Sequence, residues 1–427
     1  MTSTGSSSSV ATADTAPASV DLVVGLTSFQ AASTIGGVTE AVRDGVARFQ
    51  GVSNRIVLVD AGSTDGTAAR AREALAGAGE LVEISPARAP GDLLEMPYHG
   101  MPGKARALHA ILTQARQLGA RACVVLDAGV QTVAPQWLEL LAGPILRHNF
   151  DLVAPVYRRH AFEGALTKGI VYPLFRALYG ARLRQPAGAE FACSQRLLDR
   201  FLQEDVWDRD GSQVGIDLWL ATAAASGDFR LGEAALGIRR SPPRGDAALD
   251  LPATVRQVVG SLLADLEGRV ERWQRVRGST PVQQFGELPP TPPSEGPTVD
   301  PERLMESYRL GYRELRDIWT YVLPPRTIIE LRRLIDGPPA AFRMDDELWA
   351  RIVYDFALGF RLRVLARDHL LQSLVPLYLG WLASFVLQVR DRPHEVVHET
   401  VERLGAAFET QKSYLIARWR WPERFRH

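Results

Sequence analysis

Cysteine and net charge are both scarce in this chain of 427 residues. Its two cysteines, Cys123 and Cys193, lie in separate apolar stretches and are too few for a disulfide framework or a four-ligand metal site. Lysine plus arginine and aspartate plus glutamate both total 49, so no basic field favours a nucleic-acid partner. We therefore expect a protein of the reducing cytoplasm that binds no nucleic acid.

Long uncharged apolar runs are rare as well. The first 20 residues, "MTSTGSSSSVATADTAPASV", lack the basic start and apolar centre of a secretory signal, and they predict a disordered tail. One later run, residues 370–389, contains no charge and is long enough to cross a membrane. Its glutamines, serines and proline, together with charge-rich flanks, favour a buried core helix, so we expect no membrane span.

Between residues 20 and 160, short β-branched runs alternate with longer segments of helical pattern. The runs are "DLVVGL", "RIVLVD", "LVEIS", "ACVVLD" and "DLVAPVY". Such alternation predicts an α/β fold with a mostly parallel sheet that helices cover on both faces. Ligands of such a sheet bind beyond the carboxyl ends of its strands, so the loops after the strands should carry the function.

The second half of the chain has a different pattern. Residues 279–300 are rich in proline and predict a linker. Beyond them, "MDDELWARIVYDFALGF" places apolar side chains on one helical stripe after two capping aspartates, and the following segments are similar. We therefore expect three parts after the tail: an α/β domain at 21–278, the linker, and a mainly α-helical domain at 301–427.

The loops after the first strands contain motifs typical of nucleotide binding. "LVDAGSTDGT" ends a strand at Asp60, whose carboxylate can accept hydrogen bonds from a base or a ribose. This turn resembles the Val-Asp-x-Gly-Ser-x-Asp-Gly-Thr turn of GT-A glycosyltransferases, and "VVGLTSFQ" resembles their first strand, with Leu26 and Thr27 on the nucleotide side. "GMPGKARALHAIL" resembles their Gly-Lys-Gly-x-Ala-Leu segment. Lys104 begins the helix there and opposes its dipole, so an anionic partner would explain it.

A lone aspartate ends the strand "ACVVLD". GT-A enzymes usually have Asp-x-Asp at this place, where the pair holds Mg²⁺ or Mn²⁺ against the donor diphosphate. The resemblance makes Asp127 the first metal ligand, but Gly129 stands in place of the second. A histidine that follows a Leu-Gly pair in these enzymes is replaced by Ser241. A Mg²⁺ or Mn²⁺ cofactor is therefore in doubt.

Three arginines lie close in sequence to Ser241, one of the two positions at which an expected metal contact is replaced. Arg239, Arg240 and Arg244 bring permanent charges and forked donors to where a diphosphate would lie. Our hypothesis is that the donor binds without a divalent cation, because these arginines and Lys104 replace it. A solvated basic turn and a decayed enzyme are the alternatives.

Two longer stretches of the sequence resemble one group of enzymes within the GT-A glycosyltransferases. "EGALTKGIVYPLFRALYGARLRQPAGAEFACS" and "VWDRDGSQVGIDLWLATAA" resemble bacterial synthases of glucosylglycerate, mannosylglycerate and glucosyl-3-phosphoglycerate. The resemblance covers most of the chain. It implies transfer of a glucosyl or mannosyl group from a nucleotide sugar to a small hydroxy acid such as D-glycerate, with retention at the anomeric carbon.

The same resemblance assigns roles to individual positions. It places the acceptor at Gly164 and Thr167 and the sugar of the donor at Gly188 and Glu190. Asp217 would lie near the reacting sugar, where a carboxylate can accept hydroxyl hydrogen bonds or stabilise positive charge. Asp217 and Asp127 are thus the catalytic candidates. Those relatives that act on phosphoglycerate carry an arginine where this chain has Ala165, which favours an unphosphorylated acceptor.

Two other functions stay open. The missing metal contacts are compatible with a non-catalytic relative that binds a sugar nucleotide. "HEVVH" matches the His-Glu-x-x-His pattern of zinc metalloproteases, with His394 and His398 as ligands, Glu395 as general base and Glu423 as a distant third ligand. The start of an exposed helix explains the same residues. A homo-oligomer is possible.

Overall fold

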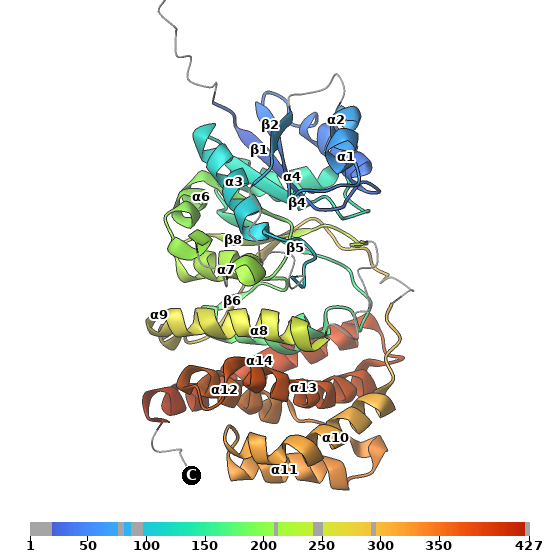
Figure 1. Cartoon of the computed structure of the whole chain (residues 1–427), viewed down its shortest axis with the longest axis vertical. Helices are drawn as coiled ribbons and strands as arrows, with labels where there is room; N and C mark the ends of the chain where they lie inside the picture. The colour runs from blue at the N-terminus through green and yellow to red at the C-terminus, as the bar shows by residue number, and fades with distance from the viewer. Residues whose placement is uncertain are drawn as a thin grey trace, which may run out of the picture.

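The computed structural model describes residues 19–75, 81–86, 97–208, 212–241, 251–291 and 296–422. Most of the predicted tail, together with Arg244 and Glu423, therefore lies outside the described residues. A β-sheet with flanking helices forms the N-terminal part, and layers of helices lie below it (Figure 1). The predicted order, an α/β region followed by a helical region, is confirmed.

The described sheet has eight strands in the order β10-β8-β5-β7-β4-β1-β2-β3. All pairings are parallel except those of β7 with β4 and β5. The strands are β1 (Leu22–Ser28), β2 (Asn54–Asp60), β3 (Leu81–Ile84), β4 (Ala122–Asp127), β5 (Leu152–Val156), β7 (Phe191–Ser194), β8 (Leu231–Ala235) and β10 (Gln283–Phe285). All five runs expected from the sequence are strands, and a mostly parallel sheet is confirmed.

Both faces of the sheet are buried, as its continuous apolar runs require. Successive side chains of β1 point to opposite faces, so Leu22 and Val24 pack in one core and Val23 in the other. The first core is covered by α1 (Ile35–Val46) and α4 (Gln136–His148), and the second by α3 (Lys104–Gln117), α6 (Gln195–Leu202) and α7 (Ser212–Ser226). The short helix α2 (Thr67–Leu75) follows β2.

Cys123 and Cys193 are closer than the sequence suggested. They are direct partners across β4 and β7, and both are buried and free. Their placement depends on β7 running antiparallel between two strands that come earlier in the chain.

The helical part surrounds the largest core. Its elements are η1 (Thr167–Val171), α5 (Tyr172–Tyr179), α8 (Leu251–Gly268), α9 (Val270–Arg275), α10 (Pro301–Thr320), α11 (Pro325–Asp336), η3 (Pro339–Ala341), α12 (Asp346–Leu362), α13 (Arg367–Val389) and α14 (His394–Arg420). Helices α5 and α8 share this core with α10–α14. Residues that precede the linker at 279–300 in the sequence and residues that follow it therefore contribute to one core. The exact domain limits stay a prediction.

The linker and the helix after it have defined structures where they are described. Gln283–Phe285 forms the edge strand β10, and β9 (Thr280–Pro281) pairs with β6 (Ala181–Arg182). Asp300 caps α10 by accepting hydrogen bonds from the backbone N–H groups of Glu302 and Arg303. Asp345 caps α12 in the same way, as its sequence predicted.

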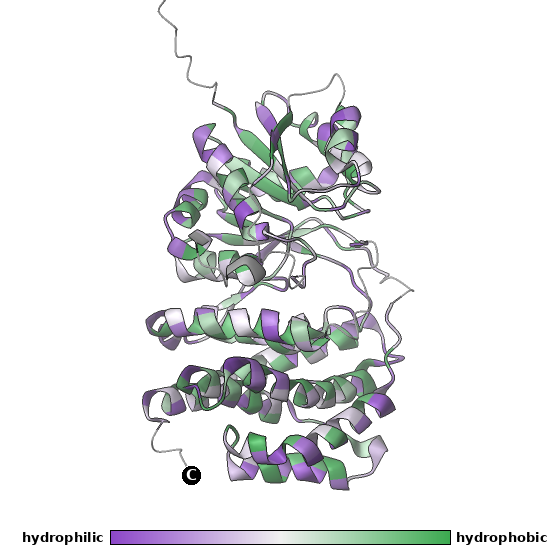
Figure 2. Ribbon diagram, in the orientation of Figure 1, coloured by the Kyte–Doolittle hydropathy of each residue, from purple (hydrophilic) through white to green (hydrophobic). Residues whose placement is uncertain are grey.

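Helix α13 contains the uncharged run noted above. It is long and apolar enough to cross a membrane, but 78% of its most apolar window is buried inside the structure. Figure 2 shows the helix as largely hydrophobic, and it packs against α10, α8 and α12. Its Trp381 stacks on Trp349 of α12, with the ring centroids 5.9 Å apart. This burial is what the core-helix interpretation requires.

The π-helical turn η1 fastens the sheet region to the helical layers. The indole N–H of Trp349 donates to the carbonyl oxygen of Gly169 at 2.8 Å. Trp381 lies so close that a Cβ on Gly169 would meet its ring at 2.4 Å, so only glycine fits here without displacement. The turn also contains Thr167, one of the two predicted acceptor residues, and the helical core therefore fixes its position.

We predict that Gly169→Ala destabilises the protein by about 1–3 kcal/mol, because the added methyl group overpacks the contact with Trp381. Gly143→Ala is the matched control. Gly143 also lies in a helix, but a Cβ there would lie 3.9 Å from Arg147 Nη1, an ordinary van der Waals contact, so this change should be neutral or stabilising by about 0.5–1 kcal/mol. Urea unfolding measures both free energies, and equal effects would contradict the close packing at Gly169.

Candidate active site

Three charged side chains meet where the carboxyl ends of the parallel strands gather. Asp127 is the last residue of β4, and Arg239 follows the end of β8. Glu190 precedes β7, and since β7 is antiparallel to its neighbours, its beginning lies at the same edge of the sheet. This edge is where ligands bind in open α/β sheets.

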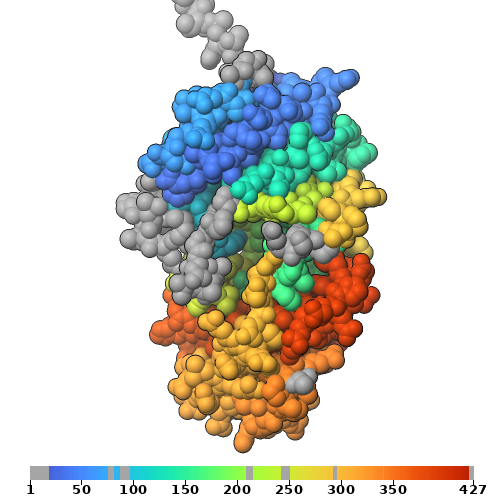
Figure 3. All heavy atoms as spheres, turned by 90° about the vertical axis from the view of Figure 1, so that its right-hand side faces the viewer, coloured from blue at the N-terminus to red at the C-terminus, as the bar shows by residue number. Residues whose placement is uncertain are grey.

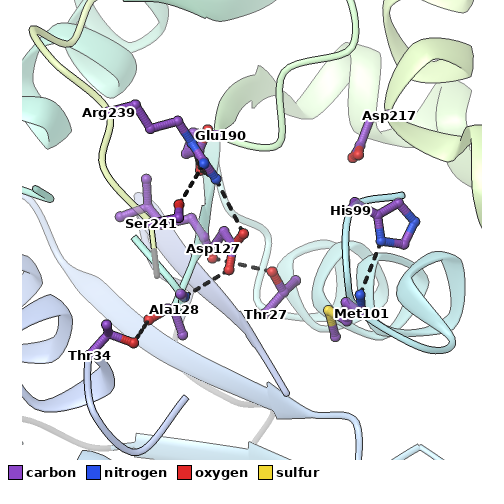
Figure 4. A network of polar contacts seen from close by, with 12 residues as sticks. Thr27, Thr34, His99, Met101, Asp127, Ala128, Glu190, Asp217, Arg239 and Ser241 are labelled. Atoms are coloured by element: carbon purple, nitrogen blue, oxygen red, sulfur yellow. Dashed lines mark hydrogen bonds and ion pairs between the residues drawn. The ribbon is translucent and has the colours of Figure 1, made fainter. Parts of the chain in front are cut away.

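The guanidinium of Arg239 joins the other two groups (Figure 4). Its Nη2 lies 2.9 Å from Glu190 Oε1 and 3.3 Å from Asp127 Oδ2. Nη1 donates to the hydroxyl oxygen of Ser241 at 2.7 Å, and the Tyr157 hydroxyl donates to Glu190 Oε2 at 2.7 Å. Five residues from four separate segments thus form one connected network.

The charges in this network depend on each other. Burial raises the pKa of the Glu190 carboxyl, but the charge of Arg239 and the hydrogen bonds from Arg239 and Tyr157 outweigh it, so the pKa is lowered overall. Glu190 is 1% exposed and stays ionised because its partner is in place. Removing one member of such a buried pair typically costs about 3–5 kcal/mol. Burial raises the pKa of Tyr157 first, and the neighbouring Glu190 raises it further.

A second pair lies beside this network. Lys104, the first residue of α3, contacts Asp217 of α7 with 2.5 Å between Nζ and Oδ2, and both side chains are buried. Gly103 allows the sharp bend before the helix, because its φ of 64° is in the left-handed region. The second carboxylate oxygen of Asp217, Oδ1, is buried and has no hydrogen-bond partner.

An unpartnered buried oxygen is unusual in a folded protein, and such an atom is able to accept a hydrogen bond from water or from a bound group. Burial raises the pKa of Asp217 despite the opposing effect of Lys104, and Glu190 and Asp127 raise it further. These two carboxylates are therefore near enough to act on Asp217. The Asp217 carboxylate points toward the side on which Asp127 and Arg239 lie (Figure 4).

The predicted nucleotide residues of β1 and β2 are fully engaged within the protein. Asp60 accepts hydrogen bonds from the Ser28 hydroxyl, from the Ser63 hydroxyl and from the backbone N–H groups of Gly62 and Ser63, at 2.6–2.9 Å. Leu26 packs in the core, and the Thr27 hydroxyl contacts the Leu126 carbonyl oxygen at 3.4 Å. Their part in nucleotide binding stays a prediction.

The loops after β1 and β2 are bound to each other, which the sequence did not reveal. The Gln30 amide and Thr64 exchange side-chain and backbone hydrogen bonds, and the Gln30 N–H donates to the Ser63 hydroxyl. Asp65 accepts from the Ala32 N–H, from the Thr67 N–H and from the Thr67 hydroxyl. These bonds explain why the Gly-Ser-x-Asp-Gly-Thr turn needs its hydroxyl and carboxylate side chains.

A cavity of about 720 Å³ adjoins the network through Tyr157. Arginine, lysine, histidine and glutamate side chains line it; they include Arg158, Arg159, Lys168, Arg184, His394, His398 and Glu402. Figure 3 shows this face recessed where residues after β5 meet the red helix α14. The buried Nε of Arg159 has no hydrogen-bond partner, which marks it as a donor available to an anion.

The remaining predicted residues lie around these features. Gly164 is next to Arg159, since a Cβ on it would lie 3.4 Å from Arg159 Nη1. Gly188 lies against Pro155, and Arg240 is exposed, with its N–H bound to the Thr132 hydroxyl. Sequence reasoning did not identify Tyr157 or Arg159. Their only signal is that Tyr157 ends a predicted strand run and that Arg159 comes two residues after it.

The zinc-protease motif lies on the first turns of α14, where His394 and His398 line the cavity. Burial, together with Arg158 and Lys168, lowers the pKa of His394. Within the described ranges, no group of three or more His, Cys, Asp or Glu side chains could hold a metal ion. The surrounding cations would also repel one.

Several solved structures are similar to this chain. Glucosyl-3-phosphoglycerate synthase from Mycobacterium tuberculosis is 24% identical over 57% of this chain and 79% of its own, with a TM-score of 0.39. Mannosyl-3-phosphoglycerate synthase from Rubrobacter xylanophilus is 22% identical over 59% and 75%, with a TM-score of 0.42. A mycobacterial protein is 26% identical over 57% and 74%, with a TM-score of 0.39.

These two named enzymes are of the kind that the sequence motifs resemble. Other structures of the Mycobacterium tuberculosis enzyme contain UDP with Mn²⁺ or Mg²⁺. No protein-family model and no curated protein matches the chain.

We predict that Lys104→Met destabilises the protein by about 3–5 kcal/mol, because it leaves the Asp217 carboxylate buried without its cation. Asp217→Asn in the Lys104→Met background should recover more than about 1 kcal/mol of this loss. Urea unfolding of both single variants and the double variant gives the coupling energy. Strictly additive effects would contradict the pair.

The loss from Lys104→Met should shrink as the pH is lowered toward the ordinary range of aspartate. Burial raises the folded-state pKa of Asp217 above its ordinary range, so the folded state holds the proton more tightly than the unfolded state. Stability therefore falls as the pH rises through the window between the two pKa values and changes no further above it. Unfolding of the variant at several pH values measures this, and a loss that is independent of pH would contradict it.

Proposed function

We propose that the protein transfers a hexosyl group, glucosyl or mannosyl, from a nucleotide sugar to a small hydroxy acid such as D-glycerate. The observation that carries the proposal is the unpartnered oxygen of Asp217, which is buried beside Asp127, Glu190 and Arg239 at the ligand-binding edge of the sheet. A sugar hydroxyl would supply the hydrogen bond that this oxygen lacks.

The donor fits the charge pattern of the site. Arg239 and Lys104 bring positive charge to the edge of the sheet, where a diphosphate requires it, and Glu190 and Asp217 bring acceptors for sugar hydroxyl groups. The motifs after β1 and β2 support binding of the nucleoside beside them. The resemblance of the sequence supports the same arrangement.

The acceptor would occupy the cavity beside Tyr157. A hydroxy acid carries a carboxylate, and the unpartnered Nε of Arg159 offers a charge-assisted hydrogen bond to it. Gly164 lies next to this arginine, and Thr167 lies in the turn that follows. The cavity is lined by further cations, which favour an anionic acceptor over a neutral one.

The transfer requires no protein nucleophile if configuration is retained. The bond between the anomeric carbon and the diphosphate oxygen breaks, and the acceptor hydroxyl oxygen bonds to the same face of that carbon. The acceptor proton then passes to the departing diphosphate. Asp217 and Glu190 would stabilise the positive charge that develops on the sugar, because pre-placed charges act strongly in a buried site.

We predict that the protein forms product when UDP-, GDP- or ADP-linked glucose and mannose are each supplied with D-glycerate. Proton NMR of the product identifies the hexose and shows whether the anomeric configuration is retained. Replacement of D-glycerate by 3-phosphoglycerate tests the acceptor. Clear nucleotide binding without any product would instead favour a non-catalytic sugar-nucleotide-binding relative.

We further predict that Asp217→Asn lowers kcat about 10²- to 10³-fold, because the site loses a charge that faces the reacting sugar. Asp336→Asn is the matched control, since Asp336 is exposed on α11 and forms only a surface ion pair. Steady-state kinetics of both variants, after their folding has been checked, measures the difference. Equal rates would remove Asp217 from the reaction.

A further inference from the structure

Arg239 contacts two of the positions to which the sequence resemblance to the glycosyltransferases assigns metal contacts. The sequence resemblance assigns the metal contacts of those enzymes to positions 127, 129 and 241. In this protein Arg239 Nη2 lies 3.3 Å from Asp127 Oδ2, and Arg239 Nη1 lies 2.7 Å from the hydroxyl oxygen of Ser241. A guanidinium therefore fills the space between two of these positions.

The residues present do not fit a Mg²⁺ or Mn²⁺ ion. Such ions need about six oxygen ligands in close contact. Here the Asp127 Oδ1 atom accepts the backbone N–H of Gly129 at 2.8 Å, and Oδ2 is paired with Arg239. A divalent cation on Asp127 would also lie beside the permanent charge of the guanidinium, which repels it.

Arg239 keeps one donor available for a ligand. A guanidinium carries five N–H groups. Its Nε and both N–H groups of Nη2 face Glu190 and Asp127, and one N–H group of Nη1 donates to Ser241. The second N–H of Nη1 has no partner among the described residues, and the side chain is 21% exposed. Glu190 and Ser241 thus hold the Arg239 guanidinium in position before a ligand binds.

We propose that Arg239 takes the place of the divalent cation and stabilises the diphosphate of the sugar nucleotide, both in the bound donor and as the leaving group. This inference rests on the proposed function. We assign the role to Arg239 because its neighbour Arg240 is exposed and bonds through its backbone to Thr132 and Gln131, outside the network around Glu190. Asp127 and Glu190 orient the guanidinium, and catalysis follows without an added metal.

Nucleotide binding tests this inference independently of turnover. Isothermal titration calorimetry of the full chain with UDP and with GDP should give the same Kd in EDTA and in MnCl₂. Arg239→Lys should weaken binding of the diphosphate about 10- to 100-fold, because one ammonium nitrogen cannot replace the separate N–H donors of the guanidinium. Binding of uridine or guanosine, which carry no phosphate, should be unchanged in that variant.

Two further variants separate this role from a structural one. Arg332→Ala, on the exposed face of α11, is the matched control and should leave diphosphate binding unchanged. Since Arg239→Ala strands a buried carboxylate and can fail to fold, Arg239→Ala is combined with Glu190→Gln. This double variant should fold, bind the diphosphate at least as weakly as Arg239→Lys, and gain nothing from MnCl₂.

The outcomes distinguish the two proposals. Diphosphate binding or product formation that requires Mn²⁺ would overturn the role of Arg239 and leave the proposed function in place. A larger loss with Arg240→Ala than with Arg239→Lys would also overturn it. No binding of any nucleotide, with or without metal, would overturn the inference and the proposed function together.

Discussion

The contact of the Arg239 guanidinium with Asp127 and Glu190 connects the parts of the site that lie farthest apart in the chain. Asp127 ends β4, Glu190 begins the antiparallel strand β7, and Arg239 follows β8. The buried carboxylate of Glu190 is stable only with its cation present, so the strand ends are held in one relative position. Tyr157 then joins this network to the cavity behind β5.

The same constraint explains the electrostatic contrast between the two buried carboxylates. The Glu190 carboxylate is paired with the Arg239 guanidinium and accepts a hydrogen bond from the Tyr157 hydroxyl, and its pKa is lowered. Asp217 has one ammonium partner and one free oxygen, and its pKa is raised. Both oxygens of Glu190 already accept hydrogen bonds from Arg239 and Tyr157, whereas Asp217 Oδ1 has its full acceptor capacity left for a ligand. Two acidic residues in one site thus have different capacities because their surroundings differ.

The helical layers contribute to the site through packing. Trp349 and Trp381 hold the turn η1 against the helical core, and α14 closes one side of the cavity with its first turns. Arg176 of α5 also pairs with Glu402 and Glu409 of α14, which fixes α14 relative to α5. The cavity beside the sheet therefore depends on residues from both halves of the chain.

The sequence by itself determined five strands of the sheet, the order of the α/β and helical regions, the cap at Asp345, and the strand-end position of Asp127. These features follow from local periodicity and capping chemistry, which short windows of sequence carry. Only the tertiary structure decided that β7 is antiparallel, which brings Glu190 to the active edge and Cys123 beside Cys193. It also decided that Asp60 accepts a hydrogen bond from Ser28 of β1, that Asp217 keeps one oxygen free and that Arg239, rather than Arg240, points inward. These outcomes depend on contacts between residues far apart in the sequence, and no local pattern records which side chains such contacts will satisfy.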